Sequence, residues 1–249
     1  MNFAFLVSFL ASISTLLGAA VLFIEYKDKN KLISKSLSFA SGVMMAVSVL
    51  DLIPSSVIGL SKNFYIFPST LLTLSFMAIG VIVSLLINKY LPSDFEKAKD
   101  SKLYKIGIFS MLAIILHNIP EGIATFLTTN ANAKLGITLA IAIALHNIPE
   151  GISISVPLYF GTGSKTKAIL YTFISGISEF FGSILAYLFL KNIASDIFIN
   201  LLYALIAGIM ISLSIEELIP NANKYSKKSV VIKYILIGII FMGIVHFIT

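Results

Sequence analysis

Eight long apolar runs, separated by short polar segments, dominate the pattern of residues along the chain. The runs cover about residues 3–25, 34–59, 66–90, 106–128, 134–158, 167–190, 198–219 and 230–248. A helix needs about 20 predominantly apolar residues to cross the hydrocarbon core of a bilayer. The pattern therefore predicts an all-α integral membrane protein with eight transmembrane helices, forming a single domain over residues 1–249.

The composition agrees with a surface covered by lipid. Hydrophobic residues make up 57% of the chain and charged residues only 12%, whereas a soluble domain carries about 25% charged residues. The absence of cysteine excludes disulfides, thiolate metal sites and thiol nucleophiles. The net charge of +6 could indicate nucleic acid, but the lysines lie between the apolar runs. We therefore expect a lipid bilayer and no nucleic acid as the partner of this chain.

The lysines predict the orientation of the helices, since positive residues gather on the cytoplasmic side. Of the 18 basic residues, 15 flank the connections between runs 1 and 2, 3 and 4, 5 and 6, and 7 and 8. The connections on the opposite side carry only Lys62, Lys134 and Lys191. This asymmetry places the N and C termini outside the cytoplasm, which requires an even number of spans.

A repeated heptapeptide carries the strongest chemical signal. Residues 116–122 and 145–151 both read LHNIPEG. Residues four apart lie on one face of a helix, so His117 pairs with Glu121 and His146 with Glu150. An isolated histidine inside a membrane span is usually a packing residue, but two identical motifs in adjacent spans favour a metal site. Asn118 and Asn147 add amide oxygens beside the two pairs.

Each motif also contains a proline, Pro120 or Pro149. Proline has no N–H to donate to the carbonyl one turn earlier, and its ring kinks or breaks a helix. The carbonyls of Leu116 and Leu145 should then lack their usual partner. Such carbonyls at membrane depth are tolerated where they line a cavity or help to hold a cation.

A third acid follows at the same interval. Glu179 lies 29 residues after Glu150, in the segment ISGISEFFGS. The small residues of this segment allow close helix packing and could bring Glu179 to the motifs as a further ligand. The alternative is an acid that hydrogen-bonds serine within the bundle. Imidazole, carboxylate and amide groups without sulfur suit Zn²⁺, Fe²⁺, Mn²⁺ or Co²⁺.

A second repeat joins runs 2 and 7. Residues 41–54 (SGVMMAVSVLDLIP) and 207–220 (AGIMISLSIEELIP) align, so that Asp51 corresponds to Glu217. The predicted orientation makes these runs antiparallel, as in an inverted-topology repeat. We expect a 3+2+3 arrangement of spans. Asp51 and Glu217 then lie near opposite membrane faces, either as pathway acids for a cation or as ordinary interfacial acids.

Two other residues inside the runs have side chains that could bind a metal. Met44 in run 2 is either a packing residue or a thioether close to the metal. His246 in the last run has no acidic neighbour in its own run, so we expect it to be a packing residue.

With these motifs, the chain resembles the ZIP family of divalent-metal transporters, in its prokaryotic ZupT-type branch. The similarity spans essentially the whole sequence and is carried by the doubled HNxPEG, SGISE, GVMMAVSVLDLIP and AGIMISLSIEELIP segments. It implies uptake of zinc, and also of iron, manganese or cobalt, across the cell membrane through a binuclear site. The implied metal ligands are His117, Asn118, Glu121, His146, Asn147, Glu150 and Glu179.

The resemblance further implies that Met44 or Asp51 contributes from span 2, that the bound ions are substrates and not cofactors, and that the protein is a homodimer. The chain departs from many family members because its 91–104 loop contains no histidine. Two transport alternatives stay open: a proton-coupled carrier of another solute that uses the same acids, and a metal exporter. An intramembrane metalloprotease needs HExxH, which is absent, so we expect no enzyme.

Overall fold

The computed structural model describes residues 2–91, 98–190 and 195–248. Within these ranges the chain is helical, and eight helical segments are long and apolar enough to cross a membrane. This confirms the all-α prediction and the number of spans. The elements are α1 (Asn2–Leu17), η1 (Gly18–Phe23), α2 (Lys29–Val47), η2 (Ser48–Leu52), α3 (Ile53–Ser61), α4 (Ile66–Tyr90), α5 (Ser101–Ala131), α6 (Ala133–Thr162), α7 (Lys165–Leu185), η3 (Ala186–Leu190), α8 (Asp196–Ser212), η4 (Leu213–Leu218), α9 (Ile219–Tyr225) and α10 (Lys228–Ile248).

Several helices extend beyond the apolar runs because polar caps start them. The carboxylate of Asp28 accepts the backbone N–H groups of Asn30 and Lys31 at the start of α2. The bond from Lys31 holds the pKa of Asp28 below its usual value. Asp100 caps α5 in the same way, by accepting from Leu103. The last residues of the 91–104 loop are therefore helical, whereas its acids Asp94 and Glu96 lie outside the described residues.

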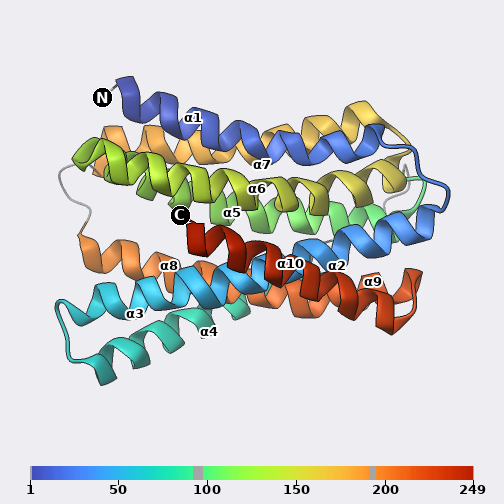
Figure 1. Cartoon of the computed structure of the whole chain (residues 1–249). Helices are drawn as coiled ribbons and strands as arrows, with labels where there is room; N and C mark the ends of the chain where they lie inside the picture. Colours follow the sequence, from blue (N-terminus) through green and yellow to red (C-terminus); the bar gives the residue numbers. More distant parts are fainter. Residues whose placement is uncertain (1, 92–97, 191–194, 249) are drawn as a thin grey trace.

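The helices form two groups, one above the other in Figure 1. The upper group contains α1, α5, α6 and α7, and the lower group contains α2, α3, α4, α8, α9 and α10. The main contacts between the groups run from α2 to α6 and from α5 to α8. The largest apolar cluster contains residues from both groups. Both LHNIPEG motifs belong to the upper group, on α5 and α6.

The α5–α6 connection consists of a single residue, Asn132. Its backbone N–H donates to the carbonyl of Thr128, 2.8 Å away, and closes α5. Its side-chain oxygen accepts the backbone N–H of Leu135 at 3.1 Å and opens α6. One residue thus ends the first motif helix and begins the second, which makes the two helices an antiparallel hairpin.

Two spans contain a π-helical turn at corresponding places. The turns η2 and η4 end two residues before Pro54 and Pro220. The backbone N–H of Ile53 donates to the carbonyl of Ser48, five residues earlier, and Ile219 donates in the same way to Ser214. The wider turn admits a proline without ending the helix. Asp51 lies in η2 and Glu217 in η4.

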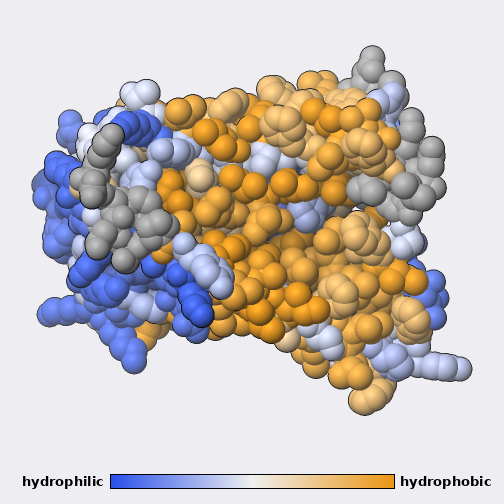
Figure 2. Space-filling model, turned by 180° about the vertical axis from the view of Figure 1, so that it is seen from behind, coloured by the Kyte–Doolittle hydropathy of each residue, from blue (hydrophilic) through white to orange (hydrophobic). Residues whose placement is uncertain are grey.

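The outer surface separates into an apolar band and a polar end. Figure 2 shows apolar residues over the length of the bundle and hydrophilic residues gathered at one end. α4 and α10 expose rows of large apolar side chains, including Phe67, Leu71, Ile240 and Ile244. Such rows suit contact with lipid, as the composition predicts.

Candidate metal site

The two LHNIPEG motifs face each other across the α5–α6 hairpin. Because the helices are antiparallel, the middle of each motif lies beside the middle of the other, and the ring centroids of His117 and His146 are 6.1 Å apart. Pro120 and Pro149 lie inside continuous helices. The expectation that these prolines break the helices is therefore wrong. Each proline removes one backbone hydrogen bond, and the packed neighbouring helices keep the helix intact.

Four buried side chains meet at this point. His117 Nε2 lies 3.3 Å from one oxygen of Glu121 and 3.3 Å from one of Glu150. His146 Nε2 is hydrogen-bonded to the other oxygen of Glu121 at 2.8 Å. Donor atoms of His117, Glu121 and His146 all lie within 4.8 Å of one another. Ligand atoms of one tetrahedral Zn²⁺ are separated by about 3.3–3.5 Å, so small shifts would let this set share one ion.

Glu179 lies beside this cluster, on α7. The amide nitrogen of Asn147 donates to one carboxylate oxygen of Glu179 at 2.9 Å. The other oxygen is buried and has no hydrogen-bond partner. Glu179 is therefore connected to the motifs through Asn147, whereas the set of mutually close donors comprises His117, Glu121 and His146.

Close helix packing brings α7 to the motifs, as the small residues predicted. Gly122 packs against the backbone of Glu179, and Gly182 against that of Ile119. The hydroxyl of Ser183 donates to the carbonyl of Gly122 at 3.1 Å. A side chain at Gly122 would collide with the Glu179 carbonyl, so these glycines set the distance between Glu179 and the hairpin.

The two asparagines are held by their nitrogens. Asn118 donates to the carbonyl of Ser175 at 3.1 Å, and Asn147 also donates to that of Ala11 at 3.2 Å. Both side-chain oxygens are buried without a hydrogen-bond partner. Buried acceptors without donors cost free energy, and a divalent cation would satisfy them.

The charges of the site also call for a cation. Glu121, Glu150 and Glu179 are all buried. Among the described residues, the ion-pair partners of Glu121 and Glu150 are histidines. An unpaired charge inside a membrane costs at least about 2.5–3.5 kcal/mol. A divalent ion would offset two of these negative charges. The arrangement has the donor chemistry of a transition-metal site.

A cavity of about 370 Å³ reaches the site from one end. Glu121 and His146 line its inner part, and Asp51 and His246 also line it. The cavity lies at the end where α5 finishes and α6 begins, which carries few lysines. Asp51 thus lines the same cavity as two residues of the cluster.

His246 contradicts the expectation from sequence. Its Nδ1 is hydrogen-bonded to a carboxylate oxygen of Asp51, so His246 is a partner of an acid and not a packing residue. The two positions are 195 residues apart. Helical periodicity reports neighbours within one span only, so the local sequence offers no signal for this pair.

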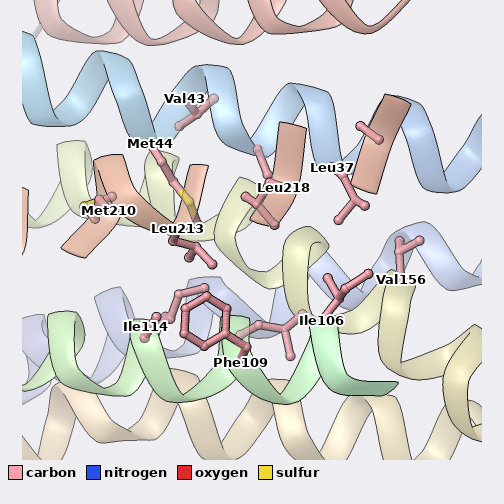
Figure 3. Close-up of a cluster of buried hydrophobic side chains, with 14 of the residues drawn as sticks. Leu37, Val43, Met44, Ile106, Phe109, Ile114, Val156, Met210, Leu213 and Leu218 are labelled. Atoms are coloured by element: carbon pink, nitrogen blue, oxygen red, sulfur yellow. The ribbon is translucent and has the colours of Figure 1, made fainter. Parts of the chain in front are cut away.

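The other two pathway candidates lie elsewhere. Glu217 accepts from Asn88 on α4 at 2.5 Å and from Asn221 at 3.0 Å, toward the lysine-rich end. Met44 is fully buried in the main apolar cluster and lies close to Val43 and Leu213 (Figure 3). The surroundings of Met44 are those of a packing residue.

The same cluster fills the space between the site and the lysine-rich end. Ile106, Phe109 and Ile114 precede His117 on α5, and each is at least 97% buried. Figure 3 shows Phe109 and Ile114 facing Leu213 of η4, and the cluster also contains Met44 of α2, so both helix groups contribute. The site therefore has a cavity on one side and packed apolar side chains on the other.

Known proteins are similar to this sequence over nearly its whole length. The family model described as ZIP Zinc transporter matches residues 92–246. The Zinc transporter ZupT of Clostridium perfringens (strain 13 / Type A) is 36% identical over 97% of this chain and 94% of its own length. Those of Streptococcus mutans and Oceanobacillus iheyensis are also 36% identical, over 97% and 98% of this chain and 95% and 97% of their own lengths. These matches confirm the resemblance, and the chain is a multi-pass cell-membrane protein that belongs to the ZIP family, a family of transporters and not of enzymes.

Proposed function

We propose that this protein carries Zn²⁺ into the cytoplasm through the buried site between α5, α6 and α7. The observation that carries the proposal is the convergence of His117, Glu121 and His146, whose donor atoms lie within 4.8 Å of one another. The relatives are named zinc transporters, and imidazole with carboxylate is a usual ligand set for Zn²⁺. The same set suits Fe²⁺, Mn²⁺ and Co²⁺, which we propose as further substrates.

We propose that the donor groups divide into two ligand sets. We assign His117, Glu121, His146 and Glu150 to a first metal position. Asn118, Asn147 and Glu179 form a second set, joined to the first through the hairpin. In support, each asparagine and Glu179 keeps a buried oxygen without a hydrogen-bond partner. The two sets hold either two ions at once or one ion in succession.

Inward transport is supported by the position of the cavity. By the lysine asymmetry, the end of the bundle with the cavity would lie outside the cytoplasm. The apolar cluster of Figure 3 would then lie on the cytoplasmic side of the site. An ion would pass Asp51, exchange water for histidine and glutamate, and leave past Glu217. A negative interior favours this direction by about 2.3 kcal/mol per charge per 100 mV. Release requires one helix group to move against the other, which would open the packed cluster.

Reciprocal contacts support the 3+2+3 inverted repeat. Gly42 packs on the backbone of Ile235 in α10, and Gly208 packs on that of Met77 in α4. In return, Gly238 of α10 packs against α2, and Gly80 of α4 packs against α8. His246, the partner of Asp51, comes eight residues after Gly238. Asn88, the partner of Glu217, comes eight residues after Gly80. The packing of α2 against α10 therefore follows the same pattern as the packing of α8 against α4.

The deciding experiment measures ⁶⁵Zn²⁺ flux into liposomes that contain the purified protein. The wild type should transport zinc without ATP, and the His117→Ala/Glu121→Ala variant should not. Glu216→Gln is the matched control, since Glu216 is an exposed acid away from the site. Unchanged flux in the double variant would end the metal-site proposal. A requirement for ATP would end secondary transport.

Liposomes of defined orientation then separate uptake from export. Zinc presented on the face that carries Lys134 should be transported when the interior is negative. Transport that proceeds only from the opposite face would favour an exporter. Cross-linking in native membranes tests the homodimer that the resemblance predicts.

A further inference from the structure

The pair of Asp51 and His246 has the same donor chemistry as the buried site. In both places an imidazole nitrogen lies against a carboxylate oxygen of another helix: His146 against Glu121, and His246 against Asp51. In the buried site these are the groups that a metal would join. The outer pair differs in exposure, since the side chain of His246 is 49% exposed and that of Asp51 33% exposed.

The pair lies where two cavities meet. The cavity that reaches Glu121 and His146 is lined by Asp51 and His246. A second cavity, of about 520 Å³, is lined by the same two residues and by Lys62, Asp196 and Asn200. The second cavity is the outer one, because α3 ends and α8 begins there. An ion that moves from the outer surface to Glu121 through these cavities must pass Asp51 and His246.

We propose that Asp51 and His246 form a separate divalent-cation site in the outer cavity, which loads Zn²⁺ and passes it to His146 and Glu121. The inference rests on the proposed function, because it needs the buried site as the acceptor. A conducting pathway needs sites that bind well enough to admit an ion and weakly enough to release it. Two protein ligands, with water completing the shell, suit that requirement. Lys62 and Asp196, both in the outer cavity, have opposite charges that offset each other.

The three histidines of the chain make the site directly observable. In the His117→Ala/His146→Ala variant, His246 is the only histidine. Protein labelled with ¹⁵N-histidine in lipid nanodiscs then gives the signal of one imidazole. Titration with ZnCl₂ should shift this signal to that of a metal-bound nitrogen. Adding Asp51→Asn should weaken the effect at least about tenfold, because outer-shell changes alone cost about 10–100-fold in metal affinity.

An imidazole signal that does not move at zinc concentrations that saturate wild-type uptake would overturn the proposal. This measurement does not depend on transport, so it separates failure of the outer site from failure of the proposed function. Ser55→Ala is the control, since Ser55 lines both cavities without being a ligand. The control should leave the zinc titration unchanged.

Uptake kinetics give a second readout. His246→Ala in an otherwise wild-type chain should raise the zinc concentration for half-maximal uptake at least about tenfold and leave the maximal rate within about twofold. The Ser55→Ala control should alter neither value. If the pair only holds α10 against η2, His246→Ala should instead change the maximal rate, and zinc should not shift the imidazole signal of His246. That result would also overturn the proposal.

Discussion

The carboxylate of Glu121 lies 2.8 Å from Nε2 of His146, on the other helix of the hairpin. The second oxygen of the same carboxylate is 3.3 Å from His117, one turn away on its own helix. Glu121 therefore joins both histidines of the repeated motif. It also lines the cavity that reaches the site from the end with few lysines, so it is the acid of the buried cluster that an ion arriving past Asp51 would contact first.

Replacing Glu121 with glutamine should lower the initial rate of ⁶⁵Zn²⁺ uptake at least about tenfold, because the change removes a charged ligand and keeps the shape. The control is Glu216→Gln, which changes an exposed acid and should retain wild-type flux. Equal rates for both variants would show that Glu121 does not bind the transported ion.

Gly122→Ala should destabilise the protein by about 1–3 kcal/mol, the usual cost of overpacking, because the new methyl group would meet the carbonyl of Glu179. Gly243→Ala is matched to it, since nothing lies within 4 Å of its added carbon. That variant should gain up to about 1 kcal/mol of helix propensity. Thermal unfolding in detergent, followed by circular dichroism, measures both. Similar midpoints would contradict the close approach of α5 and α7.

The chain has no cysteine, so single cysteines can report access to the site. Ala142 lines the cavity of about 370 Å³ that reaches Glu121 and His146, one turn before His146, whereas Ala113 is buried one turn before His117. A membrane-impermeant thiol reagent added outside should label Ala142→Cys and leave Ala113→Cys unlabelled. Labelling of Ala142→Cys only after permeabilisation would mean that the cavity faces the cytoplasm.

The predicted orientation has an independent test. Lys134 and Lys31 are both exposed, at opposite ends of the bundle. In intact cells, Lys134→Cys should react with the impermeant reagent, and Lys31→Cys should react only after permeabilisation. The reverse pattern would place both termini in the cytoplasm.

Zinc uptake should fall as the external pH is lowered from about 7 to 5, because histidine and glutamate must lose their protons to bind a metal. Histidine has an ordinary pKa of about 6.5, so protons compete with Zn²⁺ over this range. The measurement is ⁶⁵Zn²⁺ flux at fixed free zinc with a fixed membrane potential. Uptake that rises with acidity would point to proton-coupled transport.

Sequence patterns predicted those parts of the molecule that depend on one helix at a time. The apolar runs predicted eight spans, and the spacing of four predicted that His117 and Glu121 would approach each other. The repetition of the motif in adjacent spans favoured a metal site that both motifs share. Small residues around Glu179 correctly indicated close packing of α7, which the contact of Gly122 with Glu179 confirms.

Contacts between distant spans were beyond these patterns. The partner of Asp51, His246, lies on the last helix, and the rotation of that helix depends on packing around Gly238 and Gly42. The π-helical turns before Pro54 and Pro220 were likewise not predicted. A proline in the sequence indicates that one backbone hydrogen bond is missing. Whether the helix then forms a π-helical turn depends on the surrounding structure.

Asn132 has a mechanical consequence for the hairpin. Because it caps α5 and α6 at once, neither helix can slide along the other without losing both caps. A shift of one turn, about 5.4 Å, would separate Glu121 from His146. Any movement of the hairpin during transport would then keep its ligands in fixed register, and sliding would occur at its contacts with α2 and α8.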